Sequence, residues 1–282
     1  MYRARFENSK GQTFFFGYQH GNIFDIDGLT GQDLKIATSQ GFNQIGETVE
    51  NISIGSKNLE IKGRLLGEAT QMKKHMLAVF APFESGRLIF EDKYFIECSV
   101  KYTPLITPEK QDPKFELVLV APYPYWQKLT TETRKIGGWQ AMFSFPVNYA
   151  KPHIFAIEGT SGFVNIYNGG QVDANYRLEF YTKGEVENPE LINVKTQEFL
   201  RINGTFKNED KIVVYRKGGK LFVEKENNGK TENIFSMLDE DSNLFAIHAG
   251  DNVFKATAER NENLLTTTII FNAVVVGVYE GI

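Results

Sequence analysis

Hydrophobic and polar residues alternate with a period of two along much of the chain, which predicts β-strands. Residues 59–65 show this most clearly, because apolar residues and glycine take every second position and charged residues stand between them. The same pattern predicts further strands in both halves of the chain, at 87–91, 93–102, 115–120, 176–181, 211–216, 220–225, 231–235, 242–248 and 264–279. Short strands separated by turn residues are typical of sandwiches and jelly rolls, so the fold class is mainly β.

The period changes once, between Glu68 and Phe80. There the apolar residues fall on one stripe of a helix, with polar residues between them. Glu68 suits the positive end of a helix dipole, and Pro82 ends the helix. The pattern therefore predicts one amphipathic helix braced against the first half of the sheet structure by Ala69, Met72, Met76, Val79 and Phe80.

Glycine and proline mark the connections. Thr103–Lys114 holds three prolines and four charges, which predicts an exposed excursion that breaks the strands. Gln127–Gly138 is polar and ends in two glycines, which indicates a linker. We therefore expect two domains, 1–133 and 134–282. The nearly apolar run Asn272–Val278 predicts a central strand, and the pattern leaves open whether residues 272–282 complete the second domain or return to the first.

Composition excludes several classes of function. Of 282 residues, 31 are Lys or Arg and 35 are Asp or Glu, and neither sign is concentrated in one half. Tight binding of nucleic acid is not expected, because no basic stripe is present. No apolar segment is long enough to span a bilayer or to act as a signal peptide, so we expect folding in a cytoplasm and no membrane contact.

The side chains that could carry chemistry are few. Cys98 stands alone, which excludes an internal disulfide, and its place in an alternating run predicts a small buried hydrophobe. The four histidines are far apart in the sequence and show no metal-ligand spacing: His20, His75, His153 and His248. We therefore predict neither a zinc site nor a catalytic histidine, and expect His75 to pack on the flank of the helix.

Several short motifs resemble functional sites but lack a required residue. The calcium-loop start at Asp25-Ile-Asp27-Gly28 would need oxygen ligands where Leu29 and Ile36 stand. Gly229-Lys-Thr231 lacks the upstream glycine of a phosphate loop, and Gly159–Gly162 lacks the pattern of a nucleophile elbow. The remaining candidates are two glycosylation sequons and an acidic turn, at Asn51–Ser53, Asn203–Thr205 and Asp239–Asp241. No catalytic, cofactor-binding or metal-binding residue is predicted, and no cofactor.

The passage from Asn168 to Asn203 has a distinctive order. An Asn-Gly-Gly turn leads to the strand Tyr176–Tyr181, and Glu187-Asn-Pro-Glu-Leu-Ile-Asn193 follows. This order resembles the second, galectin-like domain of the distal tail proteins of siphophages. The likeness extends to the Gly-Asp-Asn252 turn. In the first half it covers the helix ending Met76–Pro82 and the closing run Ala121–Trp126.

The resemblance implies a structural protein of the phage tail tip and no enzyme. It implies an N-terminal β-sandwich or split-barrel domain with one helix, and a C-terminal galectin-like β-sandwich. The first domains would form a hexameric ring, by themselves or on a template. One face of the ring would meet the tail tube protein, and the other would meet the tail-associated lysin or the fibre or receptor-binding protein. DNA would pass through without specific binding. Assembly would take place in the bacterial host's cytoplasm.

A carbohydrate-binding module is the alternative hypothesis, since galectin-like sandwiches can hold sugars. Such sites usually place an aromatic face under the sugar ring. The second domain contains only Trp139, at its start, although tyrosine or phenylalanine could substitute.

Overall fold

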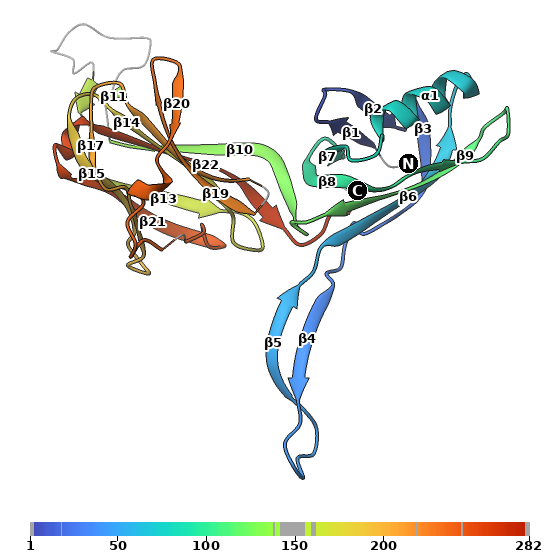
Figure 1. Ribbon diagram of the computed structural model, residues 1–282, viewed down its shortest axis with the longest axis horizontal. Helices are drawn as coiled ribbons and strands as arrows, with labels where there is room; N and C mark the ends of the chain where they lie inside the picture. Colours follow the sequence, from blue (N-terminus) through green and yellow to red (C-terminus); the bar gives the residue numbers. More distant parts are fainter. Residues whose placement is uncertain are drawn as a thin grey trace, which may run out of the picture. The chain divides into compact units, whose positions relative to one another are not determined.

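The structure is a computed structural model that describes residues 3–17, 19–137, 139–141, 156–158, 162–217, 219–243 and 245–279. The chain divides into two compact units. One unit contains Met1–Thr130 together with Val274–Ile282, and the other contains Thr131–Ala273. Figure 1 labels the elements of both units.

The first unit is a β-barrel with one helix. Its strands pair in the order β8-β7-β1-β2-β3-β6-β9, and an additional pairing of β8 with β9 closes the ring. The barrel strands are β1 (Ala4–Asn8), β2 (Thr13–Phe16), β3 (Gly21–Asp27), β6 (Lys57–Leu65), β7 (Ser85–Phe90), β8 (Tyr94–Ile106) and β9 (Lys114–Ala121). A separate hairpin consists of β4 (Leu34–Ser39) and β5 (Thr48–Ile54).

Alternation along β6 fixes which residues face the barrel interior. Leu59 and Ile61 are fully buried, and Glu60 between them is not. The register places Leu59 opposite Leu119 and Ile61 opposite Leu117, so the apolar faces of β6 and β9 coincide. A slip of one residue would turn these side chains outward, which explains why the register is well specified.

The predicted helix is confirmed as α1 (Ala69–Val79). The carboxylate of Glu68 accepts hydrogen bonds from the backbone N–H groups of Thr70 and Gln71, at 3.0 and 2.6 Å, and so caps the N-terminus. Met76 and Phe80 are fully buried, and the Phe80 ring stacks on Phe6 at 4.7 Å. The apolar stripe therefore braces the barrel, as its spacing predicts.

The expected proline-rich excursion is wrong at its start. Strand β8 continues through Pro104 to Ile106, which pairs with Phe115 of β9. Proline cannot donate a ladder hydrogen bond, but the register shifts between Tyr102 and Leu105, and Pro104 lies in that irregularity. The connection between strands is therefore limited to residues 107–113.

The second unit is a sandwich of two sheets. The larger sheet has the order β20-β19-β18-β14-β22-β10 in this unit. Its strands are β10 (Trp126–Ile136), β14 (Tyr176–Thr182), β18 (Lys211–Lys217), β19 (Lys220–Asn227), β20 (Lys230–Asn233) and β22 (Leu265–Val275). The smaller sheet has the order β13-β21-β15-β16, with β17 on β15. It contains β13 (Phe163–Asn168), β15 (Val186–Asn193), β16 (Phe199–Arg201), β17 (Thr205–Phe206) and β21 (Gly250–Arg260).

Three short features complete this unit: the pair β11 (Trp139–Ala141) and β12 (Ala156–Glu158), and the 3₁₀ turns η1 (Phe235–Met237) and η2 (Glu262–Leu264). The mainly β fold class is confirmed. One expected strand is wrong, because the described part of 242–248 forms only the isolated bridge Ala174–Ile247. Phe245 and Ile247 are buried core residues. The alternation of apolar and polar residues in this segment therefore reflects burial and not pairing in a sheet.

The polar segment after Trp126 is a strand and not a linker. Gln127 pairs with Phe95 of β8, and the later residues of β10 lie beside β22. The polar residues of β10 do not end the strand, because one face of a strand can remain exposed to solvent. The prediction that the two parts of the chain on either side of residue 133 fold independently stays a prediction.

The last described residues pack in the first unit, although the expected second domain ran to residue 282. Val275 and Val278 belong to the same buried cluster as Phe6 and Met76. The N–H of Val278 donates to the carbonyl of Leu29 at 2.9 Å. The apolar pattern of 272–278 identified a buried segment but not the core that it enters. The central strand itself is β22, which ends at Val275.

Candidate interaction surfaces

The structure brings two of the four histidines together. The rings of His20 and His75 meet edge to face at 4.8 Å, although the residues are distant in sequence. His75 Nε2 lies 3.0 Å from the carbonyl oxygen of Thr13, and His20 Nδ1 accepts from the Phe15 N–H at 3.2 Å. Burial, and to a smaller extent His75, lowers the pKa of His20. The pair thus fixes the β2–β3 connection against α1, as expected for a packed His75.

The other titratable candidates occupy structural positions as well. His248 Nδ1 lies 2.9 Å from a carboxylate oxygen of Asp173, and His153 lies outside the described residues. Cys98 is buried, and burial raises the pKa of its thiol to about 12. Across the described ranges, no three His, Cys, Asp or Glu side chains are placed to hold a metal ion.

The rejected motifs form turns where they are described. Gly28 has φ of +89°, and a Cβ there would lie 2.2 Å from the Asn58 carbonyl oxygen, so only glycine fits. Asn228 and Gly229 both have positive φ and join β19 to β20 as a tight hairpin. The Asp239 carboxylate accepts from the Asp241 N–H at 3.0 Å, which makes the acidic segment a turn. Of the Gly159–Gly162 motif, 159–161 lie outside the described residues.

The asparagines of the distinctive passage hold loops in place. The Asn168 amide donates to the carbonyl of Ile247 at 3.0 Å, and its oxygen accepts from the Gly170 N–H at 2.9 Å. The Asn252 amide donates to the His248 carbonyl at 2.7 Å. Both asparagines are almost fully buried. The motif residues therefore serve the backbone of the sandwich and present no ligand site.

A hairpin arm is the most exposed part of the first unit. It consists of β4 and β5, and every residue of both strands is exposed. Figure 1 shows the arm projecting from the end of β3 and β6. Its register pairs Leu34 with Ile54 and Ile36 with Ile52. Opposed residues project on one face, so the arm has a continuous apolar face formed by Leu34, Ile36, Val49, Ile52 and Ile54.

The other face of the arm is polar, with Lys35 opposite Ser53 and Ser39 opposite Thr48. At the tip, Phe42 and Ile45 are 98% and 102% exposed. An isolated two-stranded hairpin is at most marginally stable in water. An amphipathic ribbon with bare apolar residues at its tip is therefore a surface suited to another molecule.

The root of the arm is tied to the barrel. The N–H of Gly55 donates to the carbonyl of Asp33 at 3.0 Å, and Lys57 Nζ donates to the carbonyl of Gly31 at 2.8 Å. Gln32 Nε2 donates to the carbonyl of Val276 at 2.8 Å. The direction of the arm is thereby set by the first unit. The sequence analysis predicts no arm, and the alternation in residues 34–54 is the signal that could indicate it.

The one tryptophan side chain that the structure describes is not a platform for a sugar ring. Trp126 is fully buried, 6.1 Å from the ring of Phe90. The side chain of Trp139 lies outside what the structure describes.

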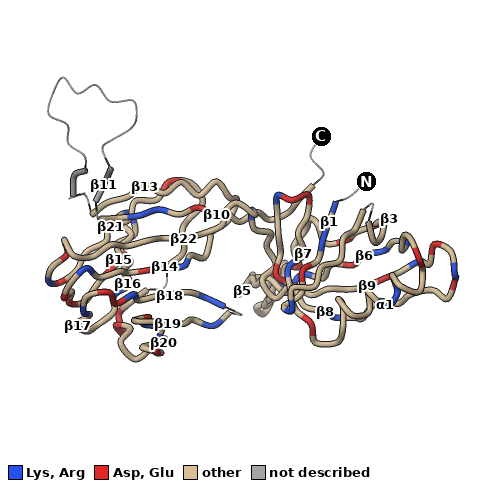
Figure 2. The backbone as a smooth tube through the Cα atoms, turned by 90° about the horizontal axis from the view of Figure 1, so that it is seen from above, with Lys and Arg blue, Asp and Glu red and all other residues tan. Residues whose placement is uncertain are grey.

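Basic and acidic residues are interspersed along the described chain in Figure 2. Within the described ranges, no helix has the length and apolar character needed to cross a membrane.

Residues 169–273 match the family model of the siphovirus-type tail component, C-terminal domain. This part of the chain is therefore similar to a domain of phage tail components. The fold agrees over nearly the whole chain with the Dit protein of phage SPP1, described as a hub of the adsorption apparatus in phages that infect Gram-positive bacteria. The TM-score is 0.67 at 12% identity, over 97% of this chain and 99% of that one.

Two structures of the phage P2 baseplate in its activated conformation also match. The calcium form has a TM-score of 0.50 at 11% identity, covering 95% of this chain and 97% of that chain. The strontium form has the same score and identity, covering 96% and 98%. No curated protein sequence matches the chain. The resemblance to the distal tail proteins of siphophages is thereby confirmed, by the family model over part of the chain and by the fold over nearly all of it.

Proposed function

We propose that this protein is a hub of the phage tail tip that self-associates into a hexameric ring through its first unit. The observation that carries the proposal is the β4–β5 arm, whose apolar face and tip have no partner within the described chain. A ring of identical subunits needs a head-to-tail interface that closes on itself. An arm that leaves one subunit and packs on the next provides such an interface.

Burial of the arm would supply part of the free energy that a specific interface needs. Full burial of a large apolar side chain contributes about 1.5–3 kcal/mol. The five face residues are 41–57% exposed, so each would contribute part of that amount. Ordering two strands and losing rotational freedom costs several kcal/mol on the same scale. A single arm is therefore a modest interface, and closure of the ring or a template such as the tail tube would make it stable.

The proposal extends to the neighbours of the ring. One face would contact the tail tube protein, and the other would contact the tail-associated lysin or the fibre or receptor-binding protein. DNA would pass through the centre without specific contacts, consistent with the mixed charges of Figure 2. The protein would act at the virion tail tip after assembly in the host cytoplasm, and it would have no catalytic activity.

The arm can be tested by changing one face at a time. Ile36→Ser with Ile52→Ser removes apolar area from one cross-strand pair without touching the barrel. We expect rings of the concentrated protein, alone or with adjacent tail proteins, to disappear in electron micrographs. Lys35→Ser, on the polar face, should leave them intact. Rings that persist in the double variant would refute the arm as the interlock, and absence of rings in every preparation of the unaltered protein would refute the hub.

A further inference from the structure

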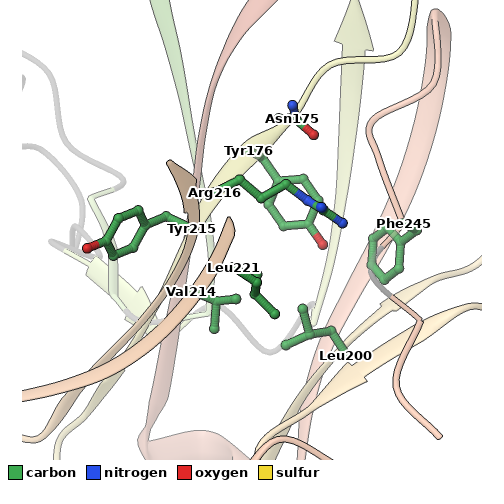
Figure 3. A pocket seen from close by; sticks show the side chains of 8 residues that line it. All are labelled: Asn175, Tyr176, Leu200, Val214, Tyr215, Arg216, Leu221 and Phe245. Atoms are coloured by element: carbon green, nitrogen blue, oxygen red, sulfur yellow. The ribbon is translucent and has the colours of Figure 1, made fainter. Parts of the chain in front are cut away.

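A small pocket in the second unit is lined by residues of both sheets (Figure 3). Its volume is about 20 Å³, which is room for roughly one water molecule. The walls come from β14, β16, β18, β19 and the segment before β21. The lining residues are Asn175, Tyr176, Leu200, Val214, Tyr215, Arg216, Leu221 and Phe245.

One polar atom directed among the lining residues is the hydroxyl of Tyr176 (Figure 3). That oxygen is buried and has no hydrogen-bond partner among the described residues. Burial raises the pKa of Tyr176, so the hydroxyl remains a neutral donor at physiological pH. Neighbouring Tyr215 differs, because its hydroxyl donates to Glu224 at 3.3 Å. Buried polar groups are normally satisfied, and an unpartnered donor beside a cavity indicates a place for an acceptor.

Three cations gather on the adjoining hairpin of β18 and β19. Arg216 lines the pocket, and Lys217 stands directly opposite Lys220. None of the three forms an ion pair with another described residue, whereas Lys211 and Lys225 on the same two strands do. Opposed like charges destabilise a strand pair, so this arrangement has a cost without an anion.

We propose that this pocket binds a carboxylate of an acidic segment in a partner polypeptide. The Tyr176 hydroxyl would donate to the carboxylate, and Arg216 would pair with its charge. Charge-assisted hydrogen bonds of this type are the strong ones in proteins. Lys217 and Lys220 would attract further acidic residues beside the bound one.

Size and charge select this ligand over others. Pockets that hold whole small molecules enclose about 300–1,000 Å³, so a sugar ring does not fit a cavity of about 20 Å³. Only one oxygen of a carboxylate, which is about the size of a water molecule, needs to enter this cavity. The three clustered cations favour a segment with several acidic residues, because complementary charge raises both affinity and the rate of encounter.

The test uses the full chain and a fluorescent peptide with the sequence Gly-Glu-Asp-Glu-Gly, blocked at both ends. Its neutral counterpart replaces Glu with Gln and Asp with Asn. We expect the acidic peptide to bind and the neutral one not to bind, as measured by anisotropy at low salt. Tyr176→Phe removes one oxygen and should weaken binding about tenfold, as should Arg216→Gln. Lys230→Gln removes a cation outside the pocket and should change affinity by less than about twofold.

Three results would overturn the proposal: equal binding of both peptides, unchanged affinity in Tyr176→Phe, or a preference for polyphosphate over the acidic peptide. The last would make the hairpin a general anion site. Circular dichroism of Tyr176→Phe checks that the fold is retained. The proposal does not depend on ring formation, because every lining residue belongs to the second unit.

Discussion

Asn168 and Asn252 are conspicuous in the sequence because glycines and further polar residues surround them. In the structure their amides bind backbone carbonyls inside the sandwich. From the sequence alone, a polar motif of this kind fits a ligand site and a turn equally well, since asparagine is common in both. Their burial decides the matter, and burial depends on segments far away in the chain. The contact between His20 and His75 could not be predicted from the sequence for the same reason.

Met76 tests the packing of α1 at a single position. Met76→Asp would place an unpaired charge in the fully buried core and should lower the free energy of unfolding by several kcal/mol. Leu77→Asp on the same helix is the control, because Leu77 is 49% exposed, and we expect about 1 kcal/mol or less. Urea unfolding of both variants measures the difference. Equal losses would contradict the assigned helix face.

Cys98 gives a prediction that depends on pH. Its folded pKa of about 12 lies above the ordinary value of about 8.5, so folding favours the neutral thiol. The resulting stabilisation is complete below pH 8.5 and is lost as the pH rises from there toward 12. Cys98→Ala should lack this part of the pH dependence. The native thiol should also resist alkylation at pH 8 and react once the chain is unfolded, and rapid labelling of the native protein would argue against its burial.

At the scale of elements, the hydrophobic pattern predicts those strands and helices that have one face in the core of their own unit. Alternation in β6 and the stripe of α1 were recognised, because each element has one face in the core. The pattern predicts no arm, since neither face of the arm meets a core in the chain itself. It predicts a linker in place of strand β10, because the polar residues of that strand face solvent. Pro104 misled for a related reason, as its place in a strand depends on a bulge that only pairing with β9 reveals.

Two glycines at the root of the arm provide a matched pair. Gly28→Ala combines a positive φ with a Cβ 2.2 Å from a backbone oxygen, and should destabilise the first unit by about 1–3 kcal/mol or more. Gly31 also has positive φ, but its Cβ would meet nothing within 4 Å, so Gly31→Ala should cost only about 1 kcal/mol. Thermal unfolding distinguishes the two. A larger effect at Gly31 would show that the turn is wrongly assigned.

At the scale of the whole molecule, the sequence indicated two β-rich halves but not how the chain is shared between them. Strand β22 lies in the second unit as far as Ala273, whereas its last residue, Val275, and Val278 lie in the core of the first unit. No periodicity encodes that choice, because a buried apolar run fits either core equally well. The pairing of β13 with β21 joins distant segments and was likewise not predictable.

The return of the chain can be tested with fragments. Residues 1–133 alone lack Val275 and Val278, so we expect this fragment to unfold at lower denaturant concentration than the first unit of the full chain. A fragment that joins 1–131 to 272–282 by a short glycine linker should recover the loss. The Asn272 amide lies 3.0 Å from the Thr131 hydroxyl, so the linker is geometrically easy. Equal stability of the two fragments would mean that the closing segment contributes little.

The same return imposes an order on synthesis. A ribosome delivers residues 1–130 first, but Val275 and Val278, which complete their core, follow only after the second unit. The second unit can therefore fold before the core of the first unit is complete, which reverses the usual order in which the N-terminal domain folds first. A subunit whose translation stops early would carry an incomplete barrel. The position of these valines thus makes the first core depend on a segment that follows the whole second unit in the chain.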